Sequence, residues 1–239
     1  MESGRPLTGK AALITGASRG IGLAIARKLA EMGANVALCA RKPEPLAAAA
    51  AELKKLGVKV FSMPADITVA GDVTRLVNAT TAALRPVDIL VNNAGLGEFG
   101  PFHELSEADW DITLDTNLKG AFLMSRAVAP GMIQKRGGHI INISSLAGKN
   151  AFKGGAIYCA SKWGLMGLTA CMAEELRDYG IRVSVVCPGS VDTEFSLHEG
   201  RDKSKMLRAD DVAHAVAALV TQGPTSFMSE VLLRPLQKP

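Results

Sequence analysis

The sequence is poor in the residues that mark metal-binding and secreted proteins. Its 239 residues include only four cysteines and four histidines, and no two cysteines have the C-x-x-C spacing typical of a zinc site. The histidines are scattered too, so the sequence predicts no metal site. Three of the four cysteines lie in apolar surroundings, and we expect buried free thiols of a reducing compartment. The four are Cys39, Cys159, Cys171 and Cys187.

Long apolar runs and strong charge are also missing. No run reaches the roughly 18 apolar residues that a membrane-spanning helix needs, and residues 1–10 lack the charged-then-apolar pattern of a signal peptide. Lysine and arginine number 27 against 23 acidic residues, a net charge of +4 without a basic cluster. The sequence thus indicates neither a nucleic-acid nor a membrane partner. We expect a cytoplasmic protein that can accept an anionic cofactor or substrate.

What the chain does contain is a regular alternation of short apolar runs with helical patterns. The runs are almost continuously apolar, which is typical of strands in a sheet covered on both faces. They fall at residues 10–15, 35–40, 58–63, 87–91, 139–143, 182–187 and 230–234. The longest helical patterns between them are 107–135, with a bend expected near Pro130, and 156–179. This order predicts an α/β fold, a single domain over residues 1–239 with a doubly wound parallel sheet of about seven strands.

A glycine-rich turn follows the first apolar run. Gly16, Gly20 and Gly22 precede or begin the helical pattern that starts near Ile21. Glycines at this place let the backbone turn tightly and approach a pyrophosphate, whose charge is met by the helix N-terminus. Their spacing is G-x-x-x-G-x-G and differs from the usual G-x-G-x-x-G of dinucleotide sites. Turn residues without a ligand are the alternative.

The end of the second strand indicates which nicotinamide cofactor such a turn would hold. NAD enzymes usually place an acid there, on the ribose 2′-hydroxyl, whereas an arginine suits the 2′-phosphate of NADP. This chain has Arg41 at that point and no carboxylate, and Arg19 in the turn adds a second guanidinium. NADP(H) is therefore favoured over NAD. The alternative is two solvated surface arginines.

Tyr158 and Lys162 lie four residues apart in the second long helical pattern and so point the same way. An ammonium near a phenol favours the phenolate, so we expect Lys162 to lower the pKa of Tyr158. That change would make the tyrosine a proton donor or acceptor near neutral pH. The same spacing is also common on ordinary amphipathic helices, so the pair alone does not predict catalysis.

Six motifs in order resemble the short-chain dehydrogenase/reductase family, over essentially the whole chain. They are Thr15-Gly16-x-x-x-Gly20-x-Gly22, Asn92-Asn93-Ala94-Gly95, Asn117, Ser144-Ser145, Tyr158-x-x-x-Lys162 and Pro188-Gly189. The resemblance implies a single-domain Rossmann fold and hydride transfer between NADP(H) and a carbonyl compound or secondary alcohol. Within the family, the chain resembles reductases of 3-oxoacyl groups on acyl carrier protein and reductases of small carbonyl compounds.

The resemblance implies a catalytic tetrad of Asn117, Ser145, Tyr158 and Lys162. Tyr158 would exchange a proton with the substrate oxygen. Ser145, which matches the family's serine better than its neighbour by its distance to the tyrosine, would hydrogen-bond the same oxygen. Lys162 would lower the pKa of the tyrosine and bind the nicotinamide ribose, and Asn117 would hold a water that links Lys162 to solvent.

The resemblance also implies a cofactor site gathered from the loops that follow the strands. Asp66 and Ile67 would contact the adenine, and Pro188 and Gly189 would help to close over the nicotinamide. The full set is Gly16, Ser18, Arg19, Gly20, Ile21, Gly22, Arg41, Asp66, Ile67, Asn93, Ala94, Gly95, Tyr158, Lys162, Pro188, Gly189, Val191 and Thr193.

Assembly and substrate are less closely defined by the sequence. The resemblance implies a homotetramer or homodimer built from the two long helices, in which Trp163, Met166 and Ala170 face either the sheet or a partner. Residues 194–207 would form a short polar lid that has few apolar residues. Those apolar lid residues are Phe195, Leu197 and Met206. Candidate pocket walls, with ordinary packing as the alternative, are Phe99, Phe102, Leu146, Phe152 and Phe195.

Several functions remain open at this point. A 3-oxoacyl carrier-protein reductase would meet its partner through Lys135, Arg136 and Arg177, although the chain lacks the glycine-rich ending common in such reductases. The sequence also leaves room for an NADPH-binding regulator without turnover and for an isomerase or dehydratase. A regulator typically lacks the tyrosine or the lysine, and this chain has both. The leading prediction is an NADP(H)-dependent carbonyl reductase or alcohol dehydrogenase acting on a small molecule.

Overall fold

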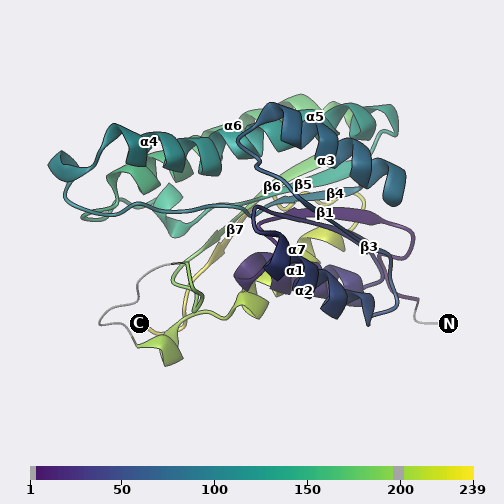
Figure 1. Cartoon of the computed structure of the whole chain (residues 1–239), viewed down its shortest axis with the longest axis horizontal. Helices are drawn as coiled ribbons and strands as arrows, with labels where there is room; N and C mark the ends of the chain where they lie inside the picture. Colours follow the sequence, from purple (N-terminus) through teal and green to yellow (C-terminus); the bar gives the residue numbers. More distant parts are fainter. Residues whose placement is uncertain (1–3, 196–201) are drawn as a thin grey trace.

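The computed structural model describes residues 4–195 and 202–239. These residues form one seven-stranded sheet in which every neighbouring pair of strands is parallel, in the order β3-β2-β1-β4-β5-β6-β7 (Figure 1). The strands are β1 (Ala11–Thr15), β2 (Asn35–Ala40), β3 (Val60–Pro64), β4 (Ile89–Asn92), β5 (Gly138–Ile143), β6 (Ile181–Pro188) and β7 (Glu230–Leu233). The predicted α/β, doubly wound fold is confirmed, and each strand lies within two residues of its predicted bounds at either end.

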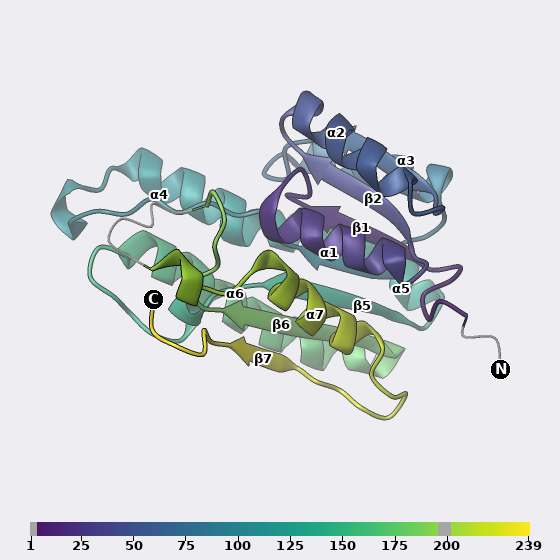
Figure 2. The same ribbon diagram turned by 90° about the horizontal axis from the view of Figure 1, so that it is seen from below.

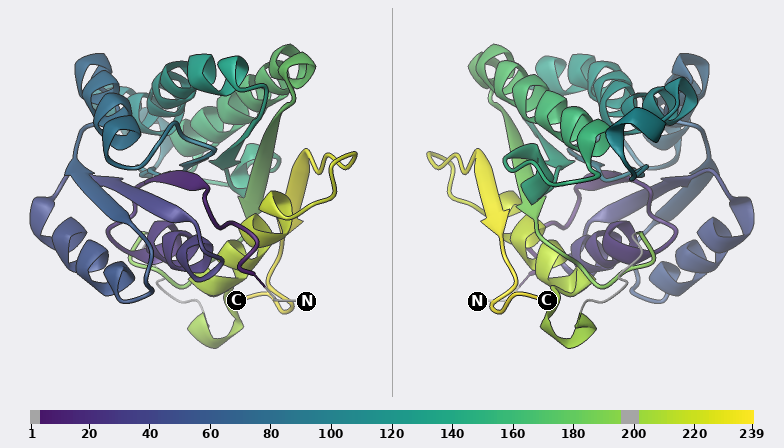
Figure 3. Two further views of the ribbon diagram at one scale, coloured as in Figure 1. Left: turned by 90° about the vertical axis from the view of Figure 1, so that its right-hand side faces the viewer. Right: turned by 90° about the vertical axis from the view of Figure 1, so that its left-hand side faces the viewer.

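Helices cover both faces of the sheet (Figures 1 and 3). One face carries α1 (Gly20–Glu31), α2 (Pro43–Lys54) and α7 (Ala209–Val220). The other carries α3 (Ala70–Ala83), α5 (Gly120–Gln134) and α6 (Ala156–Leu176). Seen from the side of α1 and α7, the strands run side by side between these layers (Figure 2).

The two-sided cover explains why the strands are apolar along their whole length. In β1, Ile14 packs into the core beneath α1 and α7, while Leu13 packs into the core beneath α3 and α5. Successive side chains of a strand point to opposite faces, so both faces need apolar residues. Burying each such side chain contributes about 1.5–3 kcal/mol, and the sheet is therefore the rigid part of the molecule that positions the loops.

The stretch predicted as one helix over residues 107–135 is two α-helices joined by a π-helical turn. α4 (Glu107–Leu114) leads into η2 (Asp115–Lys119), and α5 follows at once. This irregular turn is centred on Asn117, and Pro130, where a bend is expected, lies inside α5. A π-helical turn adds a residue to the helix and lets one side chain turn inward.

All four cysteines are free thiols, as expected. Cys39, Cys159 and Cys187 are buried and Cys171 is exposed, with no disulfide among them.

α6 ends earlier than predicted, because residues 177–179 form a 3₁₀ turn that Gly180 terminates at a positive φ of 71°. Among the described residues, no helix is long and apolar enough to cross a bilayer. The boundary of the domain at residues 1–239 stays a prediction.

Candidate active site

A cleft of about 1900 Å³ opens at the carboxyl ends of the strands. It lies where the strand order reverses, because β1 is flanked by β2 on one side and β4 on the other. In parallel sheets this point leaves a crevice between loops that lead to opposite faces. Of the expected site residues, all line the cleft except Gly22 and Asn117, which lie beneath it.

The glycine-rich turn after β1 is pinned to the loop after β4. Thr15 Oγ1 accepts hydrogen bonds from the backbone N–H groups of Asn93 and Ala94, both at 3.0 Å. The amide of Asn93 donates to the carbonyl oxygens of Thr15 and Gly16 at 3.0 and 3.2 Å. The paired Asn-Asn motif thus has a structural part to play, since Asn93 holds two walls of the cleft together.

Two glycines make this close approach possible. A Cβ at Gly22 would lie 2.3 Å from the Gly16 carbonyl oxygen and 2.5 Å from the Asn93 amide nitrogen. Gly16 has a φ of 64°, and its Cβ would lie 2.9 Å from the Ala94 Cα. Neither position accepts a side chain without displacing the backbone. The turn therefore presents bare backbone at the start of α1, the arrangement that a pyrophosphate requires.

Arg19 and Arg41 both line the cleft, as the sequence predicts. Arg41 lies near Asp66 and affects the pKa of its carboxyl group. Burial raises that pKa, but the hydrogen bonds from Thr68 and the positive charge of Arg41 lower it below its ordinary value. Arg19 forms an ion pair with Glu194, from the segment after β6. This ion pair crosses the cleft, and no pattern in the sequence indicates it, because the partners are far apart along the chain.

Ser145, Tyr158 and Lys162 come together on one wall of the cleft. The Ser145 side chain lies near the Tyr158 hydroxyl and favours its ionised form. The ammonium of Lys162 donates to the backbone carbonyl of Ile143 at 3.0 Å and lies 5.7 Å from the centroid of the Tyr158 ring. Both Tyr158 and Lys162 are buried, and both belong to the first two turns of α6.

The pKa of Tyr158 differs from the expectation. Burial raises the pKa of Tyr158 to about 12, although the Ser145 side chain works in the opposite direction. Burial lowers the pKa of Lys162 to about 8. The predicted lowering of the tyrosine pKa is not found, because Lys162 faces the tyrosine ring and desolvation dominates both groups. At neutral pH Tyr158 carries its proton, which makes it a donor.

Asn117 occupies the π-helical turn and binds protein groups on every side. Its Oδ1 accepts from the Leu96 N–H at 2.8 Å, and its Nδ2 donates to the Leu96 carbonyl and to Ser161 Oγ at 2.8 and 2.9 Å. Both amide hydrogens are used, which leaves one lone pair on Oδ1. A Cβ at Gly95 would lie 3.1 Å from that oxygen and 3.6 Å from Lys162 Nζ. The water-holding role stays a prediction, and Asn117 itself anchors the loop after β4.

The expected pocket walls divide into two groups. Leu146, Phe99, Phe152 and Phe195 line the cleft. Phe102 does not, because it lies on the 3₁₀ turn η1 (Phe102–Glu104) and is 80% exposed. Of the expected lid, Met206 is buried, while Leu197 lies outside the described residues.

The cations suggested for carrier-protein docking lie away from the cleft. Lys135 Nζ donates to Val87 O and to Asp88 Oδ1, at 2.7 and 2.8 Å, beside the amino end of β4. Arg136 donates to the Asp178 carbonyl, and Arg177 pairs with Glu174. All three lie near the amino ends of the strands, whereas the cleft lies at the carboxyl ends. They do not form a docking face next to its mouth.

Comparisons with known proteins identify the family of the chain. A family model described as short chain dehydrogenase matches residues 10–204. The 3-oxoacyl-[acyl-carrier-protein] reductase FabG of Staphylococcus epidermidis is 38% identical over 223 residues, which cover 89% of this chain and 91% of the relative. Glycine betaine reductase ATRR of Emericella nidulans is 36% identical over 98% of this chain, which spans only 19% of that longer relative.

A solved structure shows the same architecture. A metagenomic short-chain oxidoreductase crystallised in complex with NADP has 47% sequence identity to this chain and a TM-score of 0.86. The match covers 98% of this chain and 100% of the other.

Proposed function

Because the chain belongs to the short chain dehydrogenase family of oxidoreductases, we propose that it transfers a hydride between NADP(H) and a small molecule. The substrate is a carbonyl compound or the corresponding secondary alcohol. The observation that carries this proposal is the convergence of Ser145, Tyr158 and Lys162 on one wall of the cleft. The cofactor supplies or accepts the hydride, and the protein positions it and moves the proton.

In reduction, Tyr158 donates its proton to the carbonyl oxygen as the hydride arrives. Its raised pKa keeps the phenol protonated throughout the physiological range. Ser145, whose side chain lies near the tyrosine hydroxyl, orients the same oxygen and stabilises developing negative charge. Lys162 places a positive charge over the tyrosine ring and, since it lines the same wall of the cleft, would bind the ribose of the cofactor. Asn117 holds the loop after β4 against α6, because it hydrogen-bonds Leu96 and Ser161.

NADP(H) fits the cleft for two reasons. The glycine-rich turn can pack tightly against the loop after β4 only with glycine at positions 16 and 22, and it lines the cleft at the start of α1, where backbone N–H groups would meet a pyrophosphate. Arg19 and Arg41 lie on the part of the cleft wall next to the ends of β1 and β2, where a 2′-phosphate would lie. The relative with 47% identity was crystallised with NADP, which supports the same choice.

A 3-oxoacyl thioester on a carrier protein is the second candidate substrate. The similarity to the FabG reductase favours it. The positions of the cations do not favour it. Lys135, Arg136 and Arg177 bind groups of this chain at the amino ends of the strands, away from the cleft.

The first prediction concerns Tyr158. Tyr158→Phe keeps the ring and removes the proton, so turnover should fall by about 10²–10⁴ while the affinity for NADPH changes little. A panel of aldehydes, diketones, hydroxy acids and ketoacyl thioesters, followed by NADPH absorbance, provides the substrate and the rate. Tyr179→Phe is the matched control, because Tyr179 is exposed at the end of α6. Full turnover by Tyr158→Phe would show that the proton comes from elsewhere.

The second prediction concerns cofactor choice. Arg41→Asp replaces a guanidinium with the carboxylate that NAD enzymes place on the ribose 2′-hydroxyl, so NADPH should bind about 10- to 100-fold more weakly, while NADH should bind at least as tightly as before. Glu194→Gln should have the opposite effect, because it releases Arg19 from its ion pair and leaves that cation free for the 2′-phosphate. Arg177→Asp, at the end of the sheet opposite the cleft, is the control. The assignment fails if Arg41→Asp leaves the NADPH-to-NADH ratio of affinities unchanged.

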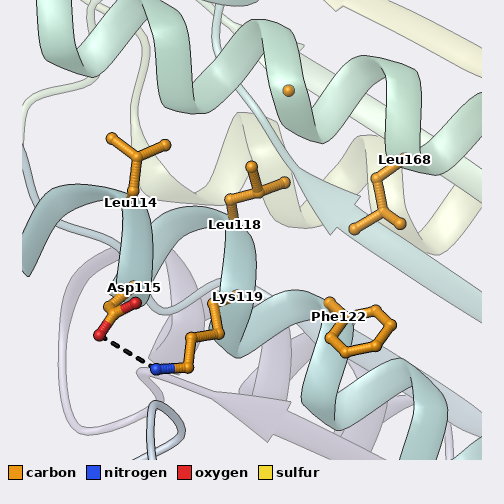
Figure 4. A pocket seen from close by; sticks show the side chains of 7 residues that line it. Leu114, Asp115, Leu118, Lys119, Phe122 and Leu168 are labelled. Atoms are coloured by element: carbon orange, nitrogen blue, oxygen red, sulfur yellow. Dashed lines mark hydrogen bonds and ion pairs between the residues drawn. The ribbon is translucent and has the colours of Figure 1, made fainter. Parts of the chain in front are cut away.

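We also propose that the protein is at least a homodimer, through α4, η2, α5 and α6. A groove of about 410 Å³ runs between these helices, lined by Leu114, Leu118, Phe122, Leu168 and the Asp115–Lys119 ion pair (Figure 4). Large apolar side chains around it are 43–54% exposed, more than single scattered residues would explain. They are Trp110, Ile112, Phe122 and Trp163.

Of the α6 residues expected to face either the sheet or a partner, Trp163 and Ala170 point outward and Met166 contacts Cys187 in the interior. Analytical ultracentrifugation at micromolar concentration should therefore give at least twice the chain mass of 25.1 kDa. Phe122→Glu should shift the protein towards monomer, whereas Val69→Glu, exposed on a different face, should not. A monomeric parent protein at these concentrations contradicts the proposal.

A further inference from the structure

Three phenylalanine rings surround Tyr158 in the cleft. The centroids of Phe99 and Phe195 lie 5.3 and 5.9 Å from the centroid of the tyrosine ring, and Phe152 lies 6.1 Å from Phe99. The interplanar angles are 60°, 51° and 40°, so the rings meet in tilted arrangements. The three come from different loops, after β4, before α6 and after β6; Phe99 and Phe195 pack on the Tyr158 ring, and Phe152 packs on Phe99.

These rings are surface of the cleft and are not part of the cores. Phe99, Phe152 and Phe195 are 44%, 47% and 43% exposed, and all three line the cavity that holds Tyr158. The large side chains that are fully buried in the cores are aliphatic, such as Leu13, Ile25 and Ile140. Apolar rings left open inside a cleft are characteristic of a ligand-binding wall.

Two glycines set the positions of two of the rings. A Cβ at Gly97 would lie 2.5 Å from Phe99 Cζ and 3.2 Å from Tyr158 Cδ2. A Cβ at Gly155 would lie 2.4 Å from Phe152 Cζ. Any side chain at either position would push a ring out of place, so the backbone at both glycines is shaped to receive the rings. No signal in the sequence singles out these two glycines.

We propose that Phe99, Phe152 and Phe195 form a specificity wall for carbonyl compounds that carry an aromatic ring next to the reacting carbonyl, an inference that rests on the proposed function. With the carbonyl oxygen at Tyr158 and Ser145, the attached ring lies within reach of Phe99 and Phe195. A tilted aromatic pair binds more tightly than burial alone provides, by about two- to thirteenfold for each pair. A saturated ring of the same size gains the burial without this additional attraction. A long acyl chain also loses more rotamer freedom.

Binding of ketones to a slow variant loaded with the oxidised cofactor, which has no hydride to give, tests the wall separately from the chemistry. Tyr158→Phe keeps the ring that Phe99 and Phe195 contact and removes the proton donor. Titration calorimetry on its complex with NADP⁺ would compare acetophenone with 1-cyclohexylethanone, two methyl ketones of the same size with an aromatic and a saturated ring. We expect acetophenone to bind about tenfold more tightly, the gain of one to two tilted pairs.

Two second-site variants locate the preference. Phe99→Leu in the Tyr158→Phe background should reduce the ratio of the two affinities to about two or less, because Leu retains the burial and loses the aromatic pair. Phe102→Leu, at a ring that is 80% exposed and outside the cleft, should leave the ratio unchanged. An unchanged affinity for NADPH in each variant confirms that the cofactor side of the cleft is intact.

The outcomes distinguish this inference from the function on which it rests. Equal binding of the two ketones, no detectable binding of either, or a ratio that Phe99→Leu leaves unchanged overturns the aromatic wall, whether or not the protein reduces carbonyl compounds. A tenfold preference that depends on Phe99 supports the wall even where the parent enzyme oxidises no NADPH with the panel of carbonyl compounds. In that case it is the proposed reduction that fails.

Discussion

The buried ammonium of Lys162 is the constraint on which the arrangement of the cleft depends. It donates a hydrogen bond to the carbonyl of Ile143, the last residue of β5, and burial lowers its pKa to about 8. A buried charge is costly unless its partners are held in place. The sheet supplies that rigidity, since β5 lies between β4 and β6 and is covered by helices. The lysine therefore fixes the start of α6 against the carboxyl end of the sheet, and Tyr158 with it.

A short chain of hydrogen bonds carries the same constraint to the next loop. Ser161 Oγ donates to the Tyr158 carbonyl at 2.7 Å and accepts from Asn117, which in turn holds both backbone groups of Leu96. The π-helical turn that breaks the helix between α4 and α5 is what aims Asn117 inward. Irregular turns of this kind often mark functional sites, because they give up regular helix geometry to place one side chain. Here the placed side chain joins the loop after β4 to α6.

Much of this could be predicted from the sequence, because it depends on local patterns. Continuous apolar strands, their alternation with helices and the glycines of the first turn predict the fold and the place of the cleft. The turn at Asn117, the ion pair between Arg19 and Glu194 and the absence of Phe102 from the cleft could not be predicted. They depend on which residues distant in sequence meet in space. The predicted direction of the Tyr158 pKa shift is wrong for the same reason: the spacing to Lys162 is visible in the sequence, whereas the desolvation that outweighs it is not.

The pH dependence of NADPH-driven reduction tests the role of Lys162 most directly. The value of kcat/KM for NADPH reports groups of the free enzyme. If the charge of Lys162 is needed, this value should be constant near neutral pH and fall as pH rises through about 8, where the lysine loses its proton. Tyr158, with a pKa of about 12, should contribute no decline until far higher pH. A profile that stays flat through about pH 10, well above the lysine pKa, would contradict a role for the charged lysine in the cleft.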